Sequence, residues 1–337
     1  MRKPDYTQLL KVLNKQAPDR PTLFEFFLNE ELYKLLCNNE APVRGDDFDP
    51  VRRNIYAFKN AGYDYVTAHA SHFRFPSGEL DHKLTKSLND GTVITDWESY
   101  ERYVWPSPSS YSSAHLEVCA ADLPEGMKFV VAGPGGLLEN VIQITGYDNL
   151  CAMVYEEPEL ARLIFDNVGQ RLVEYYELVV EMDSICALIS NDDWGFKTQT
   201  MLSPQHMRQY VFPWHKKIVA LGHKHNKPVL LHSCGMLGEV MDDVIDDMRY
   251  DGKHSFEDVI EPIEDAYELY KGRIALLGGI DLDFICRSTP EEVFARSKAM
   301  VERAQVTGGY GLGTGNSVPY YVPVENYLAM VDVVRKS

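Results

Sequence analysis

The sequence contains no apolar run long enough to cross a membrane. Its opening residues 1–16 carry basic side chains but lack the apolar core of a secretory signal. Glycine and proline are spread along the chain and form no block that reads as a linker. We therefore expect a cytoplasmic protein without membrane contact, folded as a single domain over residues 1–337.

Basic residues are also scarce. The 33 Lys and Arg residues against 50 Asp and Glu residues give a formal net charge of −17. A surface of this sign repels phosphates, which argues against binding to nucleic acid or to anionic lipid. An anionic small molecule is still compatible with the sequence, because a pocket can be locally positive.

The six cysteines form no CxxC pair and no dense framework. In a cytoplasmic chain of this length, such wide spacing is typical of reduced thiols, most of them buried as small apolar side chains. Cys234 is the exception, because of the residues that surround it in the sequence.

What recurs along the chain is an order of strand, loop and helix. Helix starts are marked at Ser203-Pro204 and at Thr289-Pro290, where Glu292 can complete a capping box. About eight such units favour a closed (β/α)8 TIM-like barrel, with a helical extension at residues 1–20. The candidate strands are short apolar runs at residues 22–27, 63–68, 127–132, 184–190, 228–232, 251–255, 274–278 and 309–313.

In such a barrel, chemistry is located just beyond the carboxyl ends of the strands. The run PVLLHSCG places His232 and Cys234 two residues apart at one of these ends. Side chains at positions i and i+2 of a strand point the same way, and an imidazole and a thiol are both good zinc ligands. The pair therefore indicates a zinc site, with a packed histidine beside an unrelated buried cysteine as the alternative.

Two adjacent carboxylates, Asp192 and Asp193, follow another apolar run. If both faced the barrel mouth they would interact strongly, and one could then act as a general acid or base, or as a metal ligand. The alternative is that one caps the next turn while the other faces solvent. We predict that Asp192 or Asp193 is catalytic.

The segment GKHSFED supplies further candidates. His254 and Glu257 offer nitrogen and oxygen ligands, and Lys253 could pair with a carboxylate of the substrate. A polar strand end closing onto a helix start is the alternative.

Two glycine-rich strand ends complete the set of candidates. Asp281 follows paired glycines and is expected either to contact substrate or to cap the next helix. Asn316 and Ser317 lie in the run GGYGLGTGNS and would offer polar groups to the cavity.

With these residues in place, the chain resembles the uroporphyrinogen decarboxylase superfamily. The resemblance is carried by LLHSCG, KHSFED, LLGGID, GTGNS and PVENYLAM, whose order and spacing extend roughly over residues 180–335. Residues 20–27 fit the first strand of the family. The resemblance implies a (β/α)-barrel with additional N-terminal helices.

The superfamily includes a porphyrin-pathway decarboxylase and zinc-dependent methyltransferases that act on methylated corrinoid proteins. The decarboxylase carries an arginine-rich stretch after its first strand and a histidine near position 316, whereas this chain has FEFFLNEE and Asn316. The methyltransferase branch has the H-x-C pair plus a cysteine in the last glycine-rich loop. Asn316 stands at or near the place of that cysteine, so either another residue, such as Asp193, His254 or Glu257, supplies the third ligand, or no zinc binds.

The resemblance implies a methyltransferase that moves a methyl group between a methylated corrinoid protein and a thiol or tetrahydrofolate-type acceptor, assisted by zinc. The corrinoid would be carried by the partner protein. The alternatives are a decarboxylase of the uroporphyrinogen type, and a non-catalytic corrinoid- or tetrapyrrole-binding protein. The sequence leaves the oligomeric state open, with a homo-oligomer as one alternative.

Overall fold

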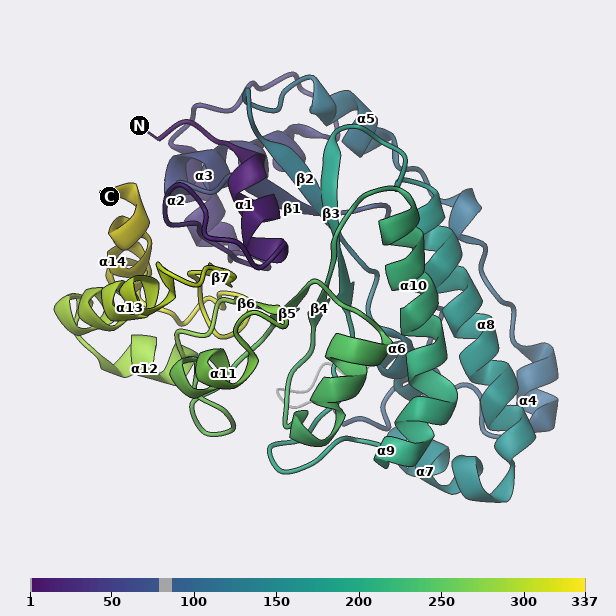
Figure 1. The fold of residues 1–337 in the computed structure, drawn as a ribbon. Coiled ribbons are helices and arrows are strands. Elements are labelled where there is room, and N and C mark those ends of the chain that lie inside the picture. Colours follow the sequence, from purple (N-terminus) through teal and green to yellow (C-terminus); the bar gives the residue numbers. More distant parts are fainter. Residues whose placement is uncertain (1, 79–86, 337) are drawn as a thin grey trace.

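The fold is organised around one parallel sheet. In the computed structural model, which describes residues 2–78 and 87–336, seven strands pair in the order in which they occur along the chain. Figure 1 shows this sheet curling about an axis, with helices on its outer side. The strands are β1 (Tyr65–His69), β2 (Lys128–Ala132), β3 (Ile185–Asn191), β4 (Val229–His232), β5 (Gly252–His254), β6 (Ala275–Leu277) and β7 (Tyr310–Gly311).

The predicted strand at residues 22–27 occupies the eighth position of the barrel, but it is reduced to a single parallel bridge between Leu23 and Leu312. On its other edge, the hydroxyl of Tyr65 takes the place of a strand ladder. It accepts a hydrogen bond from the backbone N–H of Glu25 and donates one to the carbonyl of Glu25, both at 2.7 Å. The TIM-like barrel is therefore confirmed, closed by backbone pairing on one side and by a side chain on the other.

Helices cover the outside of the barrel and its amino-terminal end. Figure 1 places α6, α8 and α10 outside the first strands and α11 to α14 outside the last ones. The helices are α1 (Tyr6–Leu13), α2 (Glu30–Cys37), α3 (Asp49–Ala61), α4 (Trp97–Arg102), α5 (Ala114–Ala120), α6 (Leu137–Thr145), α7 (Tyr147–Glu156), α8 (Pro158–Glu177), α9 (Pro204–His206), α10 (Phe212–Lys224), α11 (Ile263–Tyr270), α12 (Leu282–Arg287), α13 (Pro290–Ala304) and α14 (Val324–Arg335). Four short 3₁₀ or π turns lie at Pro108–Ser110, Met207–Val211, Gly238–Val240 and Asp243–Asp247.

The predicted N-terminal extension forms α1, which covers the amino-terminal end of the sheet. Leu13 lies against Gly252 at the start of β5, where a methyl group on the glycine would come within 2.9 Å of the leucine side chain. With the amino-terminal end covered in this way, the strand carboxyl ends at the opposite face remain to build a site.

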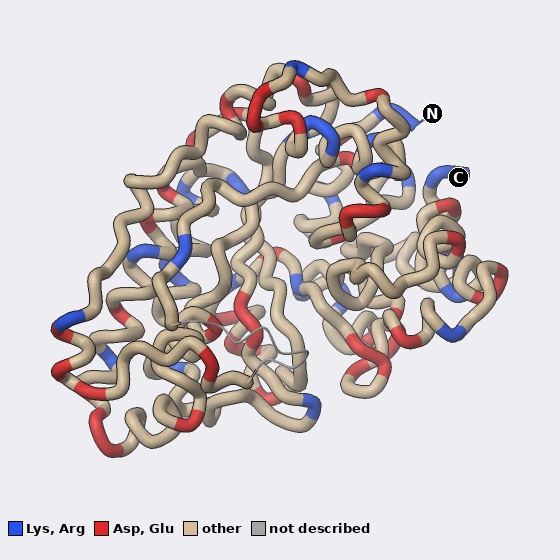
Figure 2. Tube along the Cα trace, turned by 180° about the vertical axis from the view of Figure 1, so that it is seen from behind, with Lys and Arg blue, Asp and Glu red and all other residues tan. Residues whose placement is uncertain are grey.

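The predicted helix starts are confirmed. Ser203 caps α9, and Thr289 and Glu292 make both hydrogen bonds of the capping box at the start of α13. Acidic and basic residues are interspersed along the outer helices and loops (Figure 2). Within residues 2–78 and 87–336, no helix is long and apolar enough to span a membrane.

Tyr65→Phe tests the closure of the barrel. The substitution leaves a buried backbone N–H of Glu25 without its partner, so we expect the free energy of unfolding to fall by about 1–3 kcal/mol. Urea denaturation measures this change. The control is Tyr320→Phe at an exposed tyrosine, where no change is expected; equal losses in the two variants would contradict this account of the closure.

Candidate metal centre

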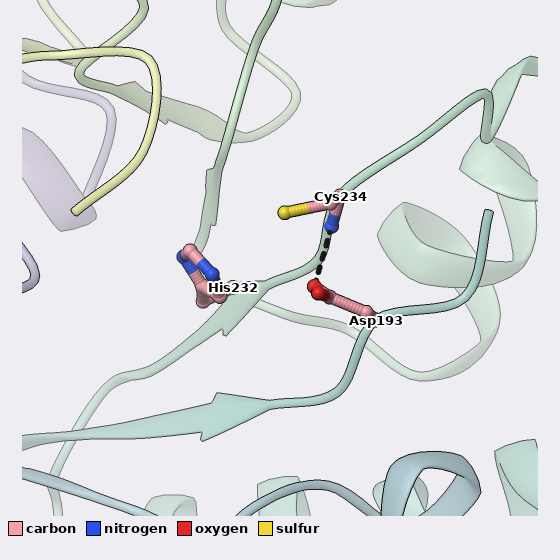
Figure 3. A group of neighbouring side chains, drawn as sticks. All are labelled: Asp193, His232 and Cys234. Atoms are coloured by element: carbon pink, nitrogen blue, oxygen red, sulfur yellow. Dashed lines mark hydrogen bonds between the residues drawn. The ribbon is translucent and has the colours of Figure 1, made fainter. Parts of the chain in front are cut away.

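The candidate site lies where β3 and β4 end side by side. The two strands pair in the register Asn191 with His232, so the residues that follow them emerge next to each other. Asp193 follows β3, His232 ends β4 and Cys234 comes two residues later. Each of these three residues offers one ligand atom, and the three atoms lie within 4.8 Å of one another (Figure 3).

Asp193 joins the two strand ends. Its Oδ1 atom accepts a hydrogen bond of 2.9 Å from the backbone N–H of Cys234. Burial raises the pKa of Asp193, and hydrogen bonds from Cys234 oppose that shift. Burial, together with the nearby Asp193 charge, raises the pKa of the Cys234 thiol to about 12. An imidazole nitrogen, a sulfur and a carboxylate oxygen form a donor set that suits zinc.

Asp192 points away from this group. Its carboxylate accepts hydrogen bonds from the side chains of Trp194, at 2.8 Å, and His215, at 2.9 Å. It also accepts from the backbone N–H groups of Leu138 and Glu139, in the first turn of α6. Asp192 therefore caps the start of α6, earlier in the chain, and not the turn that follows β3, and its oxygens are occupied by four donors. Its neighbour Asp193 faces the ligand group and not the solvent.

His254 contacts His232 but lies outside the group of three ligand atoms. Its Nδ1 atom is 2.7 Å from Nδ1 of His232, and its Nε2 atom is 3.1 Å from the carbonyl of Thr314. Both ring nitrogens are thus engaged. Burial lowers the pKa of His254 to about 3 and places the pKa of His232 well below its usual value, so both rings are neutral at pH 7.

Lys253 and Glu257 lie beside the centre, not within it. They line a small separate cavity together with Gly235 and Glu261. The Lys253 ammonium donates a hydrogen bond to the carbonyl of Ser255, and burial lowers the pKa of this lysine to about 8. Of the predicted metal ligands, the structure therefore brings together His232 and Cys234, whereas Glu257 remains apart.

The predicted substrate contacts have different surroundings. The Nδ2 atom of Asn316 donates to the sulfur of Cys234 at 3.2 Å, and the Oδ1 atom of Asn316 accepts from the backbone N–H of Ser317. Asp281 caps α12 by accepting from the backbone N–H of Phe284, and it also accepts from that of Asp258. The capping alternative thus describes Asp281, while Asn316 touches the candidate metal centre itself.

Several residues of the centre were not found by sequence reasoning. The ring of Phe26 stacks on His232 at 4.3 Å between centroids. Glu25, fully buried, accepts hydrogen bonds from the backbone N–H and the hydroxyl of Thr314. A carboxylate inside the apolar run TLFEFF was the available signal, because an ionised group is costly to bury. Glu139 is near Asp193, and burial with the charges of the two aspartates raises its pKa to about 8.

A larger cavity of about 420 Å³ lies near this end of β1. Phe27 and His69 are among its lining residues, and their rings stack at 5.0 Å between centroids. Phe27 also packs against Phe26, whose ring covers His232. A continuous series of aromatic rings therefore connects the cavity to the candidate metal centre, and the volume is in the range of small-molecule sites.

The fold and the site define a (β/α)-barrel protein with a candidate metal centre at the carboxyl ends of its strands. The family model of uroporphyrinogen decarboxylase (URO-D) matches residues 124–337, and the chain belongs to that family. The matched residues include β4 to β7 and the motifs that follow these strands.

A curated relative and a solved structure extend the comparison. Uroporphyrinogen decarboxylase from Anaeromyxobacter dehalogenans (strain 2CP-C) is 26% identical over 191 residues, which cover 56% of this chain and 52% of that protein. The chain thus matches about half the length of this relative. A methyltransferase from Methanosarcina mazei superposes with a TM-score of 0.72 at 15% identity, covering 99% of both chains, and shows the fold.

The buried Glu25 carboxyl provides a test by pH. Burial raises its pKa from the ordinary 4.5 of an exposed glutamate to about 8, so the folded state holds a proton that the unfolded chain releases. This contribution to stability is complete below pH 4.5 and is lost as the pH rises through about 8. We expect Glu25→Gln, which cannot ionise, to lose less thermal stability than the wild type between pH 5 and pH 9. Parallel melting-temperature profiles would show that Glu25 does not titrate in this way.

Proposed function

We propose that this protein is a zinc-dependent methyltransferase that moves a methyl group between a methylated corrinoid protein and a thiol or tetrahydrofolate-type acceptor. The convergence of His232, Cys234 and Asp193 at the barrel mouth carries the proposal. Support comes from membership of the URO-D family and from the fold shared with the Methanosarcina mazei methyltransferase.

The ligand set of the proposed site comes from two neighbouring strand ends. Catalytic zinc sites usually have three protein ligands and leave one position for a substrate or water. Asp193 supplies the third ligand, in place of the cysteine that the resemblance predicts near position 316. Asn316 is close to the same centre and donates its hydrogen bond to the sulfur of Cys234.

When bound there, zinc would act as a Lewis acid that lowers the pKa of a thiol or other acceptor. Residues of this chain shield and orient the proposed ligands. Phe26 shields one face of His232 from solvent, and the amide of Asn316 holds the orientation of the Cys234 sulfur. With Asp193 as a ligand, the neighbouring Glu139 would be the carboxyl group that holds or passes on a proton.

The reactants have separate places in this proposal. The acceptor atom of the small molecule would take the open position on the metal, and the corrinoid protein would dock over the barrel mouth. Substrate contacts by Lys253, Ser317 and Asp281 remain predictions. Of these, Lys253 lines a small cavity beside Gly235, the residue that follows Cys234.

A decarboxylase is the second candidate, because the curated relative is a uroporphyrinogen decarboxylase. A substrate with many carboxylates needs cationic partners, since an unpaired carboxylate is costly to desolvate. The segment FEFFLNEE contains no arginine, and its Glu25 is buried against Thr314. This observation favours methyl transfer over porphyrin decarboxylation.

Metal analysis tests the proposed centre. We expect about one equivalent of zinc on the wild type after incubation with zinc and desalting, and almost none on Cys234→Ala, because the site then retains only two ligands. Asp193→Asn should bind more weakly than the wild type, since the charged oxygen is lost.

The matched control for the zinc measurement is Cys286→Ala. Cys286 is also a free, half-buried cysteine, and it lies in α12, outside the candidate metal centre. This variant should keep the zinc content of the wild type. Equal zinc in the wild type, Cys234→Ala and Cys286→Ala would remove His232, Cys234 and Asp193 as the binding site.

An activity assay tests the reaction class. The zinc-loaded protein is mixed with methylcobalamin and either a simple alkanethiol or tetrahydrofolate, and the methylated product is measured by mass spectrometry. We expect product from the wild type and at least about a hundredfold less from Cys234→Ala. Loss of a catalytic metal raises the activation free energy by several kcal/mol.

Uroporphyrinogen is the comparison substrate in the same assay. Release of carbon dioxide from it, without methyl transfer, would establish the decarboxylase alternative instead. Binding of methylcobalamin with no turnover, unaltered by His232→Ala, would indicate a non-catalytic binding protein.

A further inference from the structure

Three sequence motifs meet behind the candidate metal centre. His254 comes from KHSFED, Gly278 from LLGGID and Thr314 from GTGNS. The rings of His232 and His254 lie 4.9 Å apart between centroids, and both histidines are buried. The proposed function uses none of these three motif residues as a ligand, so their convergence requires its own explanation.

The hydrogen bonds that join His232, His254 and Thr314 are compatible with only one placement of the ring protons. The carbonyl of Thr314 can only accept, so the Nε2 atom of His254 donates to it. A neutral imidazole has one N–H, so Nδ1 of His254 has a lone pair and accepts from Nδ1 of His232. A doubly protonated His254 is excluded because no carboxylate among the described residues pairs with this buried ring, and an unpaired buried charge is costly.

We infer that His254 is a positioning residue that fixes His232 as the Nδ1–H tautomer and so leaves the lone pair on Nε2 for a metal ion. This inference deepens the proposed zinc site and rests on it for the metal, but the tautomer is a property of the metal-free protein. Partners behind a metal-binding histidine commonly set its tautomer and orientation.

Packing holds His232, His254 and Thr314 in place. A methyl group on Gly278 would come within 2.2 Å of the Thr314 carbonyl oxygen and 2.8 Å of the His254 ring, so only glycine leaves room for their contact. The ring of Phe24 meets His254 edge-on at 5.1 Å, and Phe26 stacks on His232. Neither imidazole is therefore free to flip without displacing a buried aromatic ring.

Thr314 is fixed from its other side by Glu25. Its backbone N–H and its hydroxyl both contact the Glu25 carboxyl, at 3.3 and 2.8 Å. The Thr314 hydroxyl also contacts the carbonyl of Asn316, the residue whose amide contacts the Cys234 sulfur. The same threonine thus positions contacts to two of the three proposed ligands.

The first experiment reads the tautomer directly. Long-range ¹H–¹⁵N correlation spectra of the metal-free protein, labelled with ¹⁵N in histidine, distinguish Nδ1–H from Nε2–H rings. The His232 signals are identified as those missing from His232→Gln. We expect the Nδ1–H form for His232 and the Nε2–H form for His254. An Nε2–H form for His232 would overturn the inference, whether or not zinc binds.

The second experiment compares two substitutions of similar size at the same position. His254→Asn keeps an acceptor where Nδ1 stood, whereas His254→Leu removes it. Zinc affinity is measured by competition with a chromogenic chelator, and the fold of both variants is checked by circular dichroism. We expect His254→Leu to bind zinc about 10- to 100-fold more weakly than the wild type, with His254→Asn restoring most of the affinity.

Equal zinc affinities for His254→Asn and His254→Leu, both folded, would contradict the positioning role. Absence of zinc binding by the wild type would refute the proposed function, and the tautomer measurement would still decide the role of His254. The two failures are therefore distinguishable.

Discussion

The parallel pairing of β3 with β4 is the constraint on which the candidate centre depends. Because Asn191 pairs with His232, the chain leaves both strands at the same level, and Asp193 and Cys234 meet two residues further on. A shift of this register by one residue would turn the side chains to the opposite face. The geometry of the three potential ligands is thus set by the backbone register, and the hydrogen bond between the Asp193 carboxylate and the Cys234 backbone adds to it.

The sequence is sufficient to predict those features of the site that depend on local periodicity. The spacing of His232 and Cys234 predicts that they point the same way, and the structure places them together. The choice between Asp192 and Asp193 was not accessible, because it depends on the start of α6, which lies over fifty residues earlier and captures Asp192 through two backbone N–H groups. Contacts to Thr314 and Glu25 likewise join segments from opposite ends of the chain.

The barrel closure shows the same division between local and distant information. The apolar run at residues 22–27 correctly indicates the position of a strand, but its partner across the closing edge is the hydroxyl of Tyr65 and not a backbone ladder. No periodicity in either segment encodes that substitution. One consequence is that Glu25 faces inward beside Thr314 and links the closing edge of the barrel to the loop that carries Asn316.

The proposed ligand set, with Asp193 instead of the cysteine that the resemblance implies near Asn316, has a coherent electrostatic account. A thiolate from Cys234 and a carboxylate from Asp193 together have two negative charges, as two thiolates would, so a divalent ion would still be neutralised. A carboxylate is a harder ligand than a thiolate, so a metal held by Asp193 would be a stronger Lewis acid. The Asn316 amide adds to this effect, since its hydrogen bond withdraws electron density from the remaining sulfur. A site of this kind would favour lowering the pKa of a bound acceptor over making that acceptor more electron-rich.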